Sequence, residues 1–322
     1  MSELRDKVLD LKAHLQSIIV GQDDLIKKML ITLLASGHAL LEGAPGLAKT
    51  KAIKTLASLI NADFNRIQFT PDLLPSDITG SEIYLSSTGT FDFKKGPVFA
   101  NFILADEINR APAKVQSALL EAMAENQVSV GGKEYKLPEL FMVMATQNPI
   151  EHEGTYNLPE AQLDRFLLYI KIDQPDAVTE KRILSLVRLE DMNKNNDAST
   201  YSKMSVLEIL NARKEVLQTH ASEAVENYLI ALIMATRHPE KYDSSLKDAV
   251  RYGASPRATI ALDKCAKVNA WLEGRDFVTP EDIHTVVYDV LRHRIILSFE
   301  ALAEGLTTDD VISSLLKVVP LP

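Results

Sequence analysis

The stretch Leu40-Leu41-Glu42-Gly43-Ala44-Pro45-Gly46-Leu47-Ala48-Lys49-Thr50 decides the fold. An apolar run from Ala39 to Leu41 enters a loop with two glycines, and the loop ends in Lys49-Thr50 at the start of a helix-forming segment. This order of strand, glycine-rich loop and helix is typical of a phosphate-binding loop, in which backbone N–H groups and a helix N-terminus surround an anion. In such a loop the lysine reaches the β- and γ-phosphates of a nucleotide, and the threonine hydroxyl takes one Mg²⁺ position.

The residue before the lysine departs from the usual pattern, which has glycine there, because this chain has Ala48. A methyl group fits if residue 48 has helical dihedral angles, but not if it turns through positive φ. The stretch alone leaves two interpretations open: a nucleotide site, or a glycine-rich β–α turn that packs and binds nothing. In the first, the nucleotide contacts are Gly43, Ala44, Pro45, Gly46, Leu47, Ala48, Lys49, Thr50 and Lys51.

A later apolar run, residues 101–105, ends in two carboxylates, Asp106 and Glu107. Buried parallel strands read as continuous apolar runs, and ligands of open α/β sheets collect at their carboxyl ends. We therefore expect Asp106 to hold Mg²⁺ and Glu107 to orient and deprotonate a water aimed at the γ-phosphate. An acidic pair after a strand can also be a plain helix cap, but behind a phosphate loop the catalytic interpretation is favoured.

Residues 140–146 form another apolar run, which leads to Gln147 and Asn148. An amide at the carboxyl end of a strand can hydrogen-bond both the attacking water and the γ-phosphate, so Asn148 is a candidate catalytic residue. The alternative is a turn asparagine before Pro149, and the residues alone leave both open.

Composition narrows the class of protein. The chain has 322 residues, enough for two domains, with 46% apolar and 25% charged residues, as in ordinary globular proteins. A formal charge of −9 disfavours a protein that grips nucleic acid through a basic surface. We find no apolar run of membrane-spanning length and no signal peptide, and expect a cytoplasmic protein. The single cysteine, Cys265, is expected to be buried and inert, and Mg²⁺ is the only metal expected.

The periodicity of the chain changes at about residue 174. The first part, 1–173, alternates strands and helices and predicts a parallel sheet flanked by helices, whereas 174–322 predicts helices throughout. Two hairpins, near 82–93 and 127–137, interrupt the first part and are predicted to project from it. We therefore predict an α/β core followed by an all-α domain.

Arg257 stands at the start of a predicted helix, after Ser255-Pro256. A cation in the first turn of a helix opposes the helix dipole by about 0.3–1 kcal/mol, so an anion is expected beside it. Phosphate or a neighbouring acidic side chain would serve, and both remain open.

Taken in order, these pieces resemble a ring-forming AAA+ ATPase, and most closely the MoxR family. The residues that carry the resemblance are Gly43 to Thr50, Leu104 to Pro112, Ala145 to Pro149, Glu151 through Asp164-Arg165-Phe166, and Gly253 to Arg257. MoxR-like sequences tend to have alanine before the phosphate-loop lysine, so Ala48 supports the resemblance. It implies a P-loop parallel-sheet core with a C-terminal helical lid domain, ATP and Mg²⁺ as ligands, and hydrolysis of ATP.

The resemblance also implies a role for each matching residue. Lys49 and Thr50 correspond to the Walker A pair, Asp106 and Glu107 to the Walker B pair, Asn148 to the first sensor, Arg257 to the second, and Val20-Gly21-Gln22 to the turn beside the adenine. Arg165 corresponds to the arginine finger, which reaches the nucleotide of the next subunit, and Arg110 is a second candidate at that interface. In relatives the two hairpins face the pore of the ring.

Three functions follow from these observations. The leading one is an ATP-hydrolysing chaperone, which by resemblance forms a hexameric ring and matures protein complexes or inserts metal cofactors, with a von Willebrand A-domain protein as a partner. The second is an interaction module that binds ATP as a switch with negligible turnover. The third, a nucleic-acid motor, is disfavoured by the acidic charge and by hairpin tips that hold no basic residue at 86–90 and one at 131–133.

Overall fold

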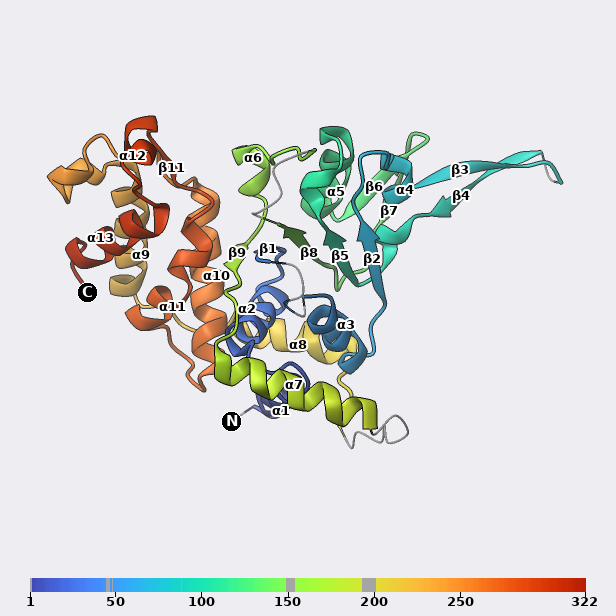
Figure 1. Ribbon diagram of the computed structural model, residues 1–322, viewed down its shortest axis with the longest axis horizontal. Helices are drawn as coiled ribbons and strands as arrows, with labels where there is room; N and C mark the ends of the chain where they lie inside the picture. Colours follow the sequence, from blue (N-terminus) through green and yellow to red (C-terminus); the bar gives the residue numbers. More distant parts are fainter. Residues whose placement is uncertain (1, 45–46, 48, 88, 149–153, 193–200) are drawn as a thin grey trace.

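The computed structural model describes residues 2–44, 47, 49–87, 89–148, 154–192 and 201–322. Its centre is a five-stranded parallel sheet with the strand order β2-β5-β8-β1-β9 (Figure 1). The strands are β1 (Ala39–Glu42), β2 (Phe64–Gln68), β5 (Phe102–Asp106), β8 (Met142–Gln147) and β9 (Leu168–Lys171). The predicted parallel sheet is confirmed, and β1, which leads into the phosphate loop, lies between β8 and β9.

The apolar runs of the strands cover both faces of the sheet, because successive side chains point to opposite sides. On one face Leu41 and Leu104 pack into a large apolar cluster with α1, α2 and α3, and on the other Leu40 and Ile103 pack with α5. These helices are α1 (Glu3–Ile18), α2 (Asp23–Leu34), α3 (Lys49–Leu59) and α5 (Ala113–Glu125). A sheet buried on both faces explains why its strands read as continuous apolar runs.

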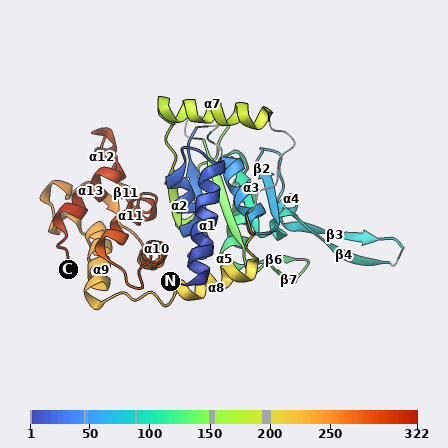
Figure 2. The ribbon, with the colours of Figure 1, turned by 90° about the horizontal axis from the view of Figure 1, so that it is seen from below.

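Two antiparallel hairpins extend from this core: β3 (Gly80–Leu85) with β4 (Thr90–Lys95), and β6 (Gln127–Val130) with β7 (Lys133–Lys136). Figure 2 shows β3 and β4 reaching well beyond the body of the protein, opposite the C-terminal helices. A five-residue helix, α4 (Pro75–Thr79), precedes the first hairpin. Its first turn contains Pro75, and Asp77 accepts from the Leu74 amide at 2.8 Å.

The rest of the chain is mainly helical. Its longer helices are α7 (Ala177–Met192), α8 (Val206–Val216), α9 (Glu223–Arg237), α10 (Pro256–Leu272), α11 (Pro280–Leu291) and α13 (Thr308–Val318). The predicted start of α10 at Ser255-Pro256 is confirmed, and α11 begins in the same way with Thr279 as its cap and Pro280 in its first turn. Among the helices that the structure describes, none is both long and apolar enough to cross a membrane.

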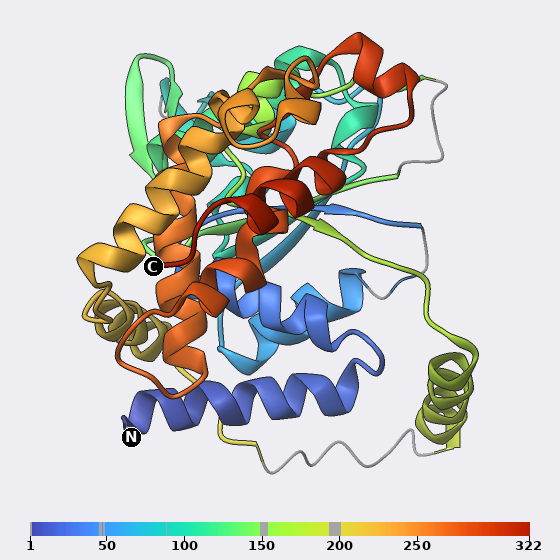
Figure 3. The same ribbon diagram turned by 90° about the vertical axis from the view of Figure 1, so that its left-hand side faces the viewer.

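Three features of this part go beyond the predicted run of helices. Where helices throughout are predicted, α11 ends at Leu291, and the strand β11 (Ile296–Leu297) pairs with β10 (Val250–Tyr252). The short helix α12 (Phe299–Ala303) follows. Helix α8 packs mainly against α1 and α2, and it also contacts α10. Helix α7 stands apart, as Figures 2 and 3 show, and none of its side chains described between 177 and 188 is buried. The domain boundary at residue 174 stays a prediction.

Candidate active site

The phosphate loop opens at the carboxyl end of β1, and α3 begins at Lys49. Lys49 Nζ donates a hydrogen bond to the Gly43 carbonyl at 2.5 Å. Both residues line a pocket of about 390 Å³, together with Leu47, Thr50, Lys51, Arg66, Asp106, Glu107, Thr146, Gln147 and Asn148. Of the other residues predicted here, Ala44 is half-buried in the loop, and Pro45, Gly46 and Ala48 lie outside the described residues.

The two predicted carboxylates face the same pocket, and each is held in place. Asp106 Oδ1 accepts from the Thr146 hydroxyl at 2.6 Å, and its Oδ2 accepts from Arg66 Nε at 3.0 Å. Glu107 Oε2 accepts from Gln68 Nε2 at 2.7 Å and pairs with Arg110 Nε at 3.2 Å. These contacts hold both acidic groups at the pocket that Lys49 also lines.

The backbone of Glu107 is left-handed, with φ 57°, which is uncommon for a residue with a side chain. Its amide donates to the Thr146 hydroxyl at 2.9 Å. The same hydroxyl therefore contacts both members of the acidic pair, and β8 supplies it from the neighbouring strand.

Sequence reasoning missed Arg66, Gln68 and Thr146. Gln68 comes close to the acidic pair only because β2 pairs with β5, which places Gln68 opposite Asp106. The available signal was position, since Gln68 and Thr146 both lie at the carboxyl ends of strands, where ligands of such sheets bind.

The donor set fits a nucleotide with Mg²⁺. Burial lowers the pKa of Lys49, although Asp106, Glu107 and Glu42 act in the opposite direction, so a half-buried cation faces the pocket. The Thr50 hydroxyl and the Asp106 carboxylate offer oxygen atoms, the ligands that Mg²⁺ prefers. The lysine, the helix N-terminus and these oxygens together match the needs of a phosphate chain and its metal.

A second pocket, of about 250 Å³, contains Gly21 and Gln22 of the predicted adenine-side turn, with residues 171–176 and Thr179 opposite. Gly21 has φ +77°, and a Cβ there would collide with the Thr179 side chain, so this position requires glycine. Val20 is half-buried just before the turn and does not line the pocket. The Ile172 amide donates to the Glu42 carbonyl at 2.8 Å, which connects this pocket with the start of the phosphate loop.

The predicted arginines lie elsewhere. Arg165 is exposed and donates to the Leu120 carbonyl at 2.7 Å, and Arg257 forms an ion pair with Asp164 at 3.7 Å. Both line a third pocket, of about 350 Å³, and neither lines the one around Lys49. Asp164 is thus an acidic neighbour of Arg257, as one of the two alternatives for this residue requires.

The parallel sheet, the loop between β1 and α3, the acidic pair after β5, the polar end of β8 and the C-terminal helices together define the class of AAA+ ATPases. Comparisons with known proteins agree. Residues 38–168 match the model of the ATPase family associated with various cellular activities (AAA), and residues 243–315 match the AAA lid domain.

The chain is 47% identical over 310 residues to Chaperone MoxR1 of Mycobacterium tuberculosis, covering 96% of this chain and 81% of that protein. It is 33% identical to Protein MoxR of Paracoccus denitrificans, over 100% of this chain and 98% of that one. A crystal structure of a Cytophaga hutchinsonii protein, 47% identical, superposes with a TM-score of 0.90 over 99% of this chain and 96% of the other. The chain therefore belongs to the MoxR family of AAA+ ATPases, as the sequence motifs indicated.

Proposed function

We propose that this protein hydrolyses ATP with Mg²⁺ at sites completed by a second copy of the chain. The observation that carries the proposal is the convergence of Lys49, Thr50, Asp106, Glu107 and Asn148 on one pocket at the carboxyl edge of the sheet. Membership of the AAA+ family implies nucleotide binding with Mg²⁺, and its members are generally oligomeric.

Each residue has one task in this proposal. Lys49 binds phosphate oxygens, and Thr50 with Asp106 would hold Mg²⁺, which when bound neutralises charge on the phosphates. Glu107, held by Gln68 and Arg110, orients a water and takes its proton. Asn148 donates a hydrogen bond at the γ-phosphate end of the pocket. The pocket of Gly21 and Gln22 takes the base.

The arginines supply the second half of the site. Arg165 and Arg257 share a pocket separate from Lys49, and both are exposed, which suits contact with the nucleotide of a neighbouring subunit. An arginine supplied in trans is worth about 10³–10⁵ in the rate of phosphoryl transfer. An isolated subunit should therefore bind ATP but turn it over slowly, and a ring, hexameric in this proposal, is part of the active site.

The cellular task in this proposal is that of a chaperone. MoxR1 carries that name, and the long β3–β4 hairpin, with Tyr84 and Phe91 exposed, offers a surface for a protein client. Maturation of protein complexes or metal cofactors, a von Willebrand A-domain partner and a cytoplasmic location complete the proposal.

The decisive experiment replaces Glu107 by glutamine and measures steady-state phosphate release and ATP binding. We expect release to fall by at least a hundredfold while ATP still binds, because the base is lost and the phosphate loop is intact. Glu121→Gln, on the exposed side of α5, is the matched control. Unchanged release in Glu107→Gln would refute hydrolysis at this site.

A mixing experiment tests the shared site. Subunits with Arg165→Ala lack the trans arginine, and subunits with Glu107→Gln lack the base, so co-assembled mixtures should recover activity that neither has alone. Mixtures that assemble but remain inactive would exclude Arg165 as the trans residue.

A further inference from the structure

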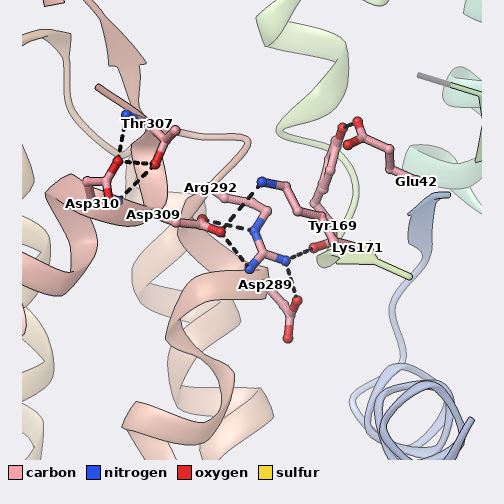
Figure 4. A network of polar contacts seen from close by, with 8 residues as sticks. All are labelled: Glu42, Tyr169, Lys171, Asp289, Arg292, Thr307, Asp309 and Asp310. Carbon is pink, nitrogen blue, oxygen red and sulfur yellow. Dashed lines mark hydrogen bonds and ion pairs between the residues drawn. The ribbon is translucent and has the colours of Figure 1, made fainter. Parts of the chain in front are cut away.

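Tyr169 on β9 joins two other strands through its hydroxyl. The hydroxyl donates to Glu42 Oε2, and Gln147 Nε2 lies 2.7 Å from the Tyr169 oxygen and 3.1 Å from Glu42 Oε2. The three side chains form a closed triangle across β9, β1 and β8, which are adjacent in the sheet. Figure 4 shows Tyr169 reaching toward Glu42.

The triangle lies directly behind the phosphate pocket. Glu42 precedes Gly43, whose carbonyl binds Lys49, and Gln147 lines the pocket and precedes Asn148. Glu42 and Gln147 are also opposite one another in the parallel pairing of β1 with β8. The hydroxyl of Tyr169 therefore connects the last side chain of β1 with the last side chain of β8. The phosphate loop with Lys49 follows β1, and Asn148 follows β8.

The hydroxyl is suited to a fixed donor role. Burial raises the pKa of Tyr169, and the adjacent Glu42 carboxylate raises it further. The phenol therefore keeps its proton at physiological pH and continues to donate to the carboxylate. A hydrogen bond with one charged partner is stronger than a bond between neutral groups.

The backbone of Tyr169 is held from the other side by the lid. Its carbonyl accepts from Arg292 Nη1 at 3.0 Å, and Arg292 also pairs with Asp289 at 2.6 Å and Asp309 at 3.1 Å (Figure 4). Lys171 on the same strand lies 3.5 Å from Asp309. The position of the triangle in the core is thus set from two directions.

We propose that Tyr169 is a positioning residue for ATP hydrolysis, whose hydroxyl holds the ends of β1 and β8 so that Lys49 and Asn148 face the same phosphate. This inference rests on the proposed function. Tyr169 does not line the phosphate pocket, so it acts through Glu42 and Gln147. Its loss should impair turnover more than nucleotide binding, because the phosphate loop and the base pocket remain.

The test is Tyr169→Phe in the full chain, with Tyr288→Phe on α11 as the matched control. We expect kcat for ATP to fall about tenfold in Tyr169→Phe, equivalent to about 1.4 kcal/mol, with ADP affinity within twofold of the wild type. In the protein without nucleotide, amide hydrogen exchange of residues 142–148 should become faster in Tyr169→Phe and stay unchanged in Tyr288→Phe.

A double-mutant cycle with Gln147→Leu separates positioning from general loss of stability. If the triangle acts as a unit, the double variant should lose little more kcat than the worse single variant. Independent, multiplying losses would overturn the proposal, and so would wild-type kcat in Tyr169→Phe. The wild-type protein is measured first. If it binds ATP but releases no phosphate, the proposed function itself is refuted, whatever the variants do.

Discussion

Replacing Asp164 by alanine should lower the free energy of unfolding by about 3–5 kcal/mol. Asp164 Oδ1 accepts from Arg294 Nε at 2.7 Å, and its Oδ2 accepts from the Ser255 hydroxyl at 2.8 Å. The Arg294 side chain is only 3% exposed, and burial lowers its pKa while the Asp164 carboxylate opposes that shift. Alanine would leave a buried guanidinium without its counter-charge, which costs about 3–5 kcal/mol in comparable buried pairs.

Asp164→Asn separates the contribution of the negative charge to the free energy of unfolding from that of the hydrogen bonds. The amide keeps an oxygen that can accept from Arg294, and Arg294 retains its bonds to the Leu167 and Phe166 carbonyls. We therefore expect a smaller loss, about 1–2 kcal/mol. The control is Asp263→Asn, which removes a partner of Lys267 at 3.0 Å in an i, i+4 pair on α10 and should cost no more than about 0.5 kcal/mol.

Urea unfolding followed by tryptophan fluorescence is the appropriate assay. The chain has one tryptophan, Trp271, which is 2% exposed on α10 and so reports on the lid helices. The expected order of stability is wild type, Asp263→Asn, Asp164→Asn and then Asp164→Ala. If Asp164→Ala unfolds at the same urea concentration as Asp263→Asn, the ion pair with Arg294 does not stabilise the docking of the lid.

Three other outcomes are expected. Burial lowers the pKa of His38 to about 4. As the pH falls below about 6.5, the unfolded chain binds a proton at this histidine before the folded chain does. The free energy of unfolding should therefore drop by about 3 kcal/mol between pH 7 and 4. Urea titrations at each pH should show a smaller drop for His38→Gln; an equal drop would contradict this assignment. Burial raises the pKa of Cys265 to about 12, so iodoacetamide at pH 8 should label it only after urea unfolding. Arg292→Met should lower the free energy of unfolding by about 2–3 kcal/mol, because Asp289 loses one of two cationic partners, and thermal unfolding within error of the wild type would refute that.

The parts of the site that the sequence predicted are those encoded in contiguous runs. The residues before Gly43 and before Asp106 are apolar runs with a polar end, and this pattern can be recognised from the sequence alone. The parts that it missed depend on which strands become neighbours. Gln68 meets Glu107 only because β2 pairs with β5, so its position at the end of a strand does not by itself identify its partner.

The contacts of Tyr169 and the β10–β11 ribbon were not predicted from the sequence, for different reasons. Tyr169 lies inside a short apolar strand, where its ring reads as core and its hydroxyl has no local partner. The ribbon has strands of three and two residues, too short to interrupt a helical pattern. The roles proposed for Arg165 and Arg257 involve a neighbouring subunit, and a single chain shows only where these two side chains lie.

Three consecutive residues after α11, Arg292, His293 and Arg294, hold the segment 164–169 of the core. Arg292 binds the Tyr169 carbonyl, His293 Nε2 lies 3.1 Å from the Phe166 carbonyl, and Arg294 binds both the carboxylate and the backbone of Asp164. Burial lowers the pKa of His293 well below its usual value, so the ring between the two arginines is neutral and adds no third positive charge.

The segment 164–169 is therefore anchored by three consecutive residues, and in the proposed mechanism its two ends serve different half-sites. Arg165 at one end points outward beside Arg257, whereas Tyr169 at the other end contacts the strand ends behind the phosphate pocket. Because Arg292 and Arg294 both follow α11 directly, a displacement of α11 would act on both ends of the segment. In the proposed ring, the lid would thus link the state of a subunit's own nucleotide to the arginine that it presents to its neighbour.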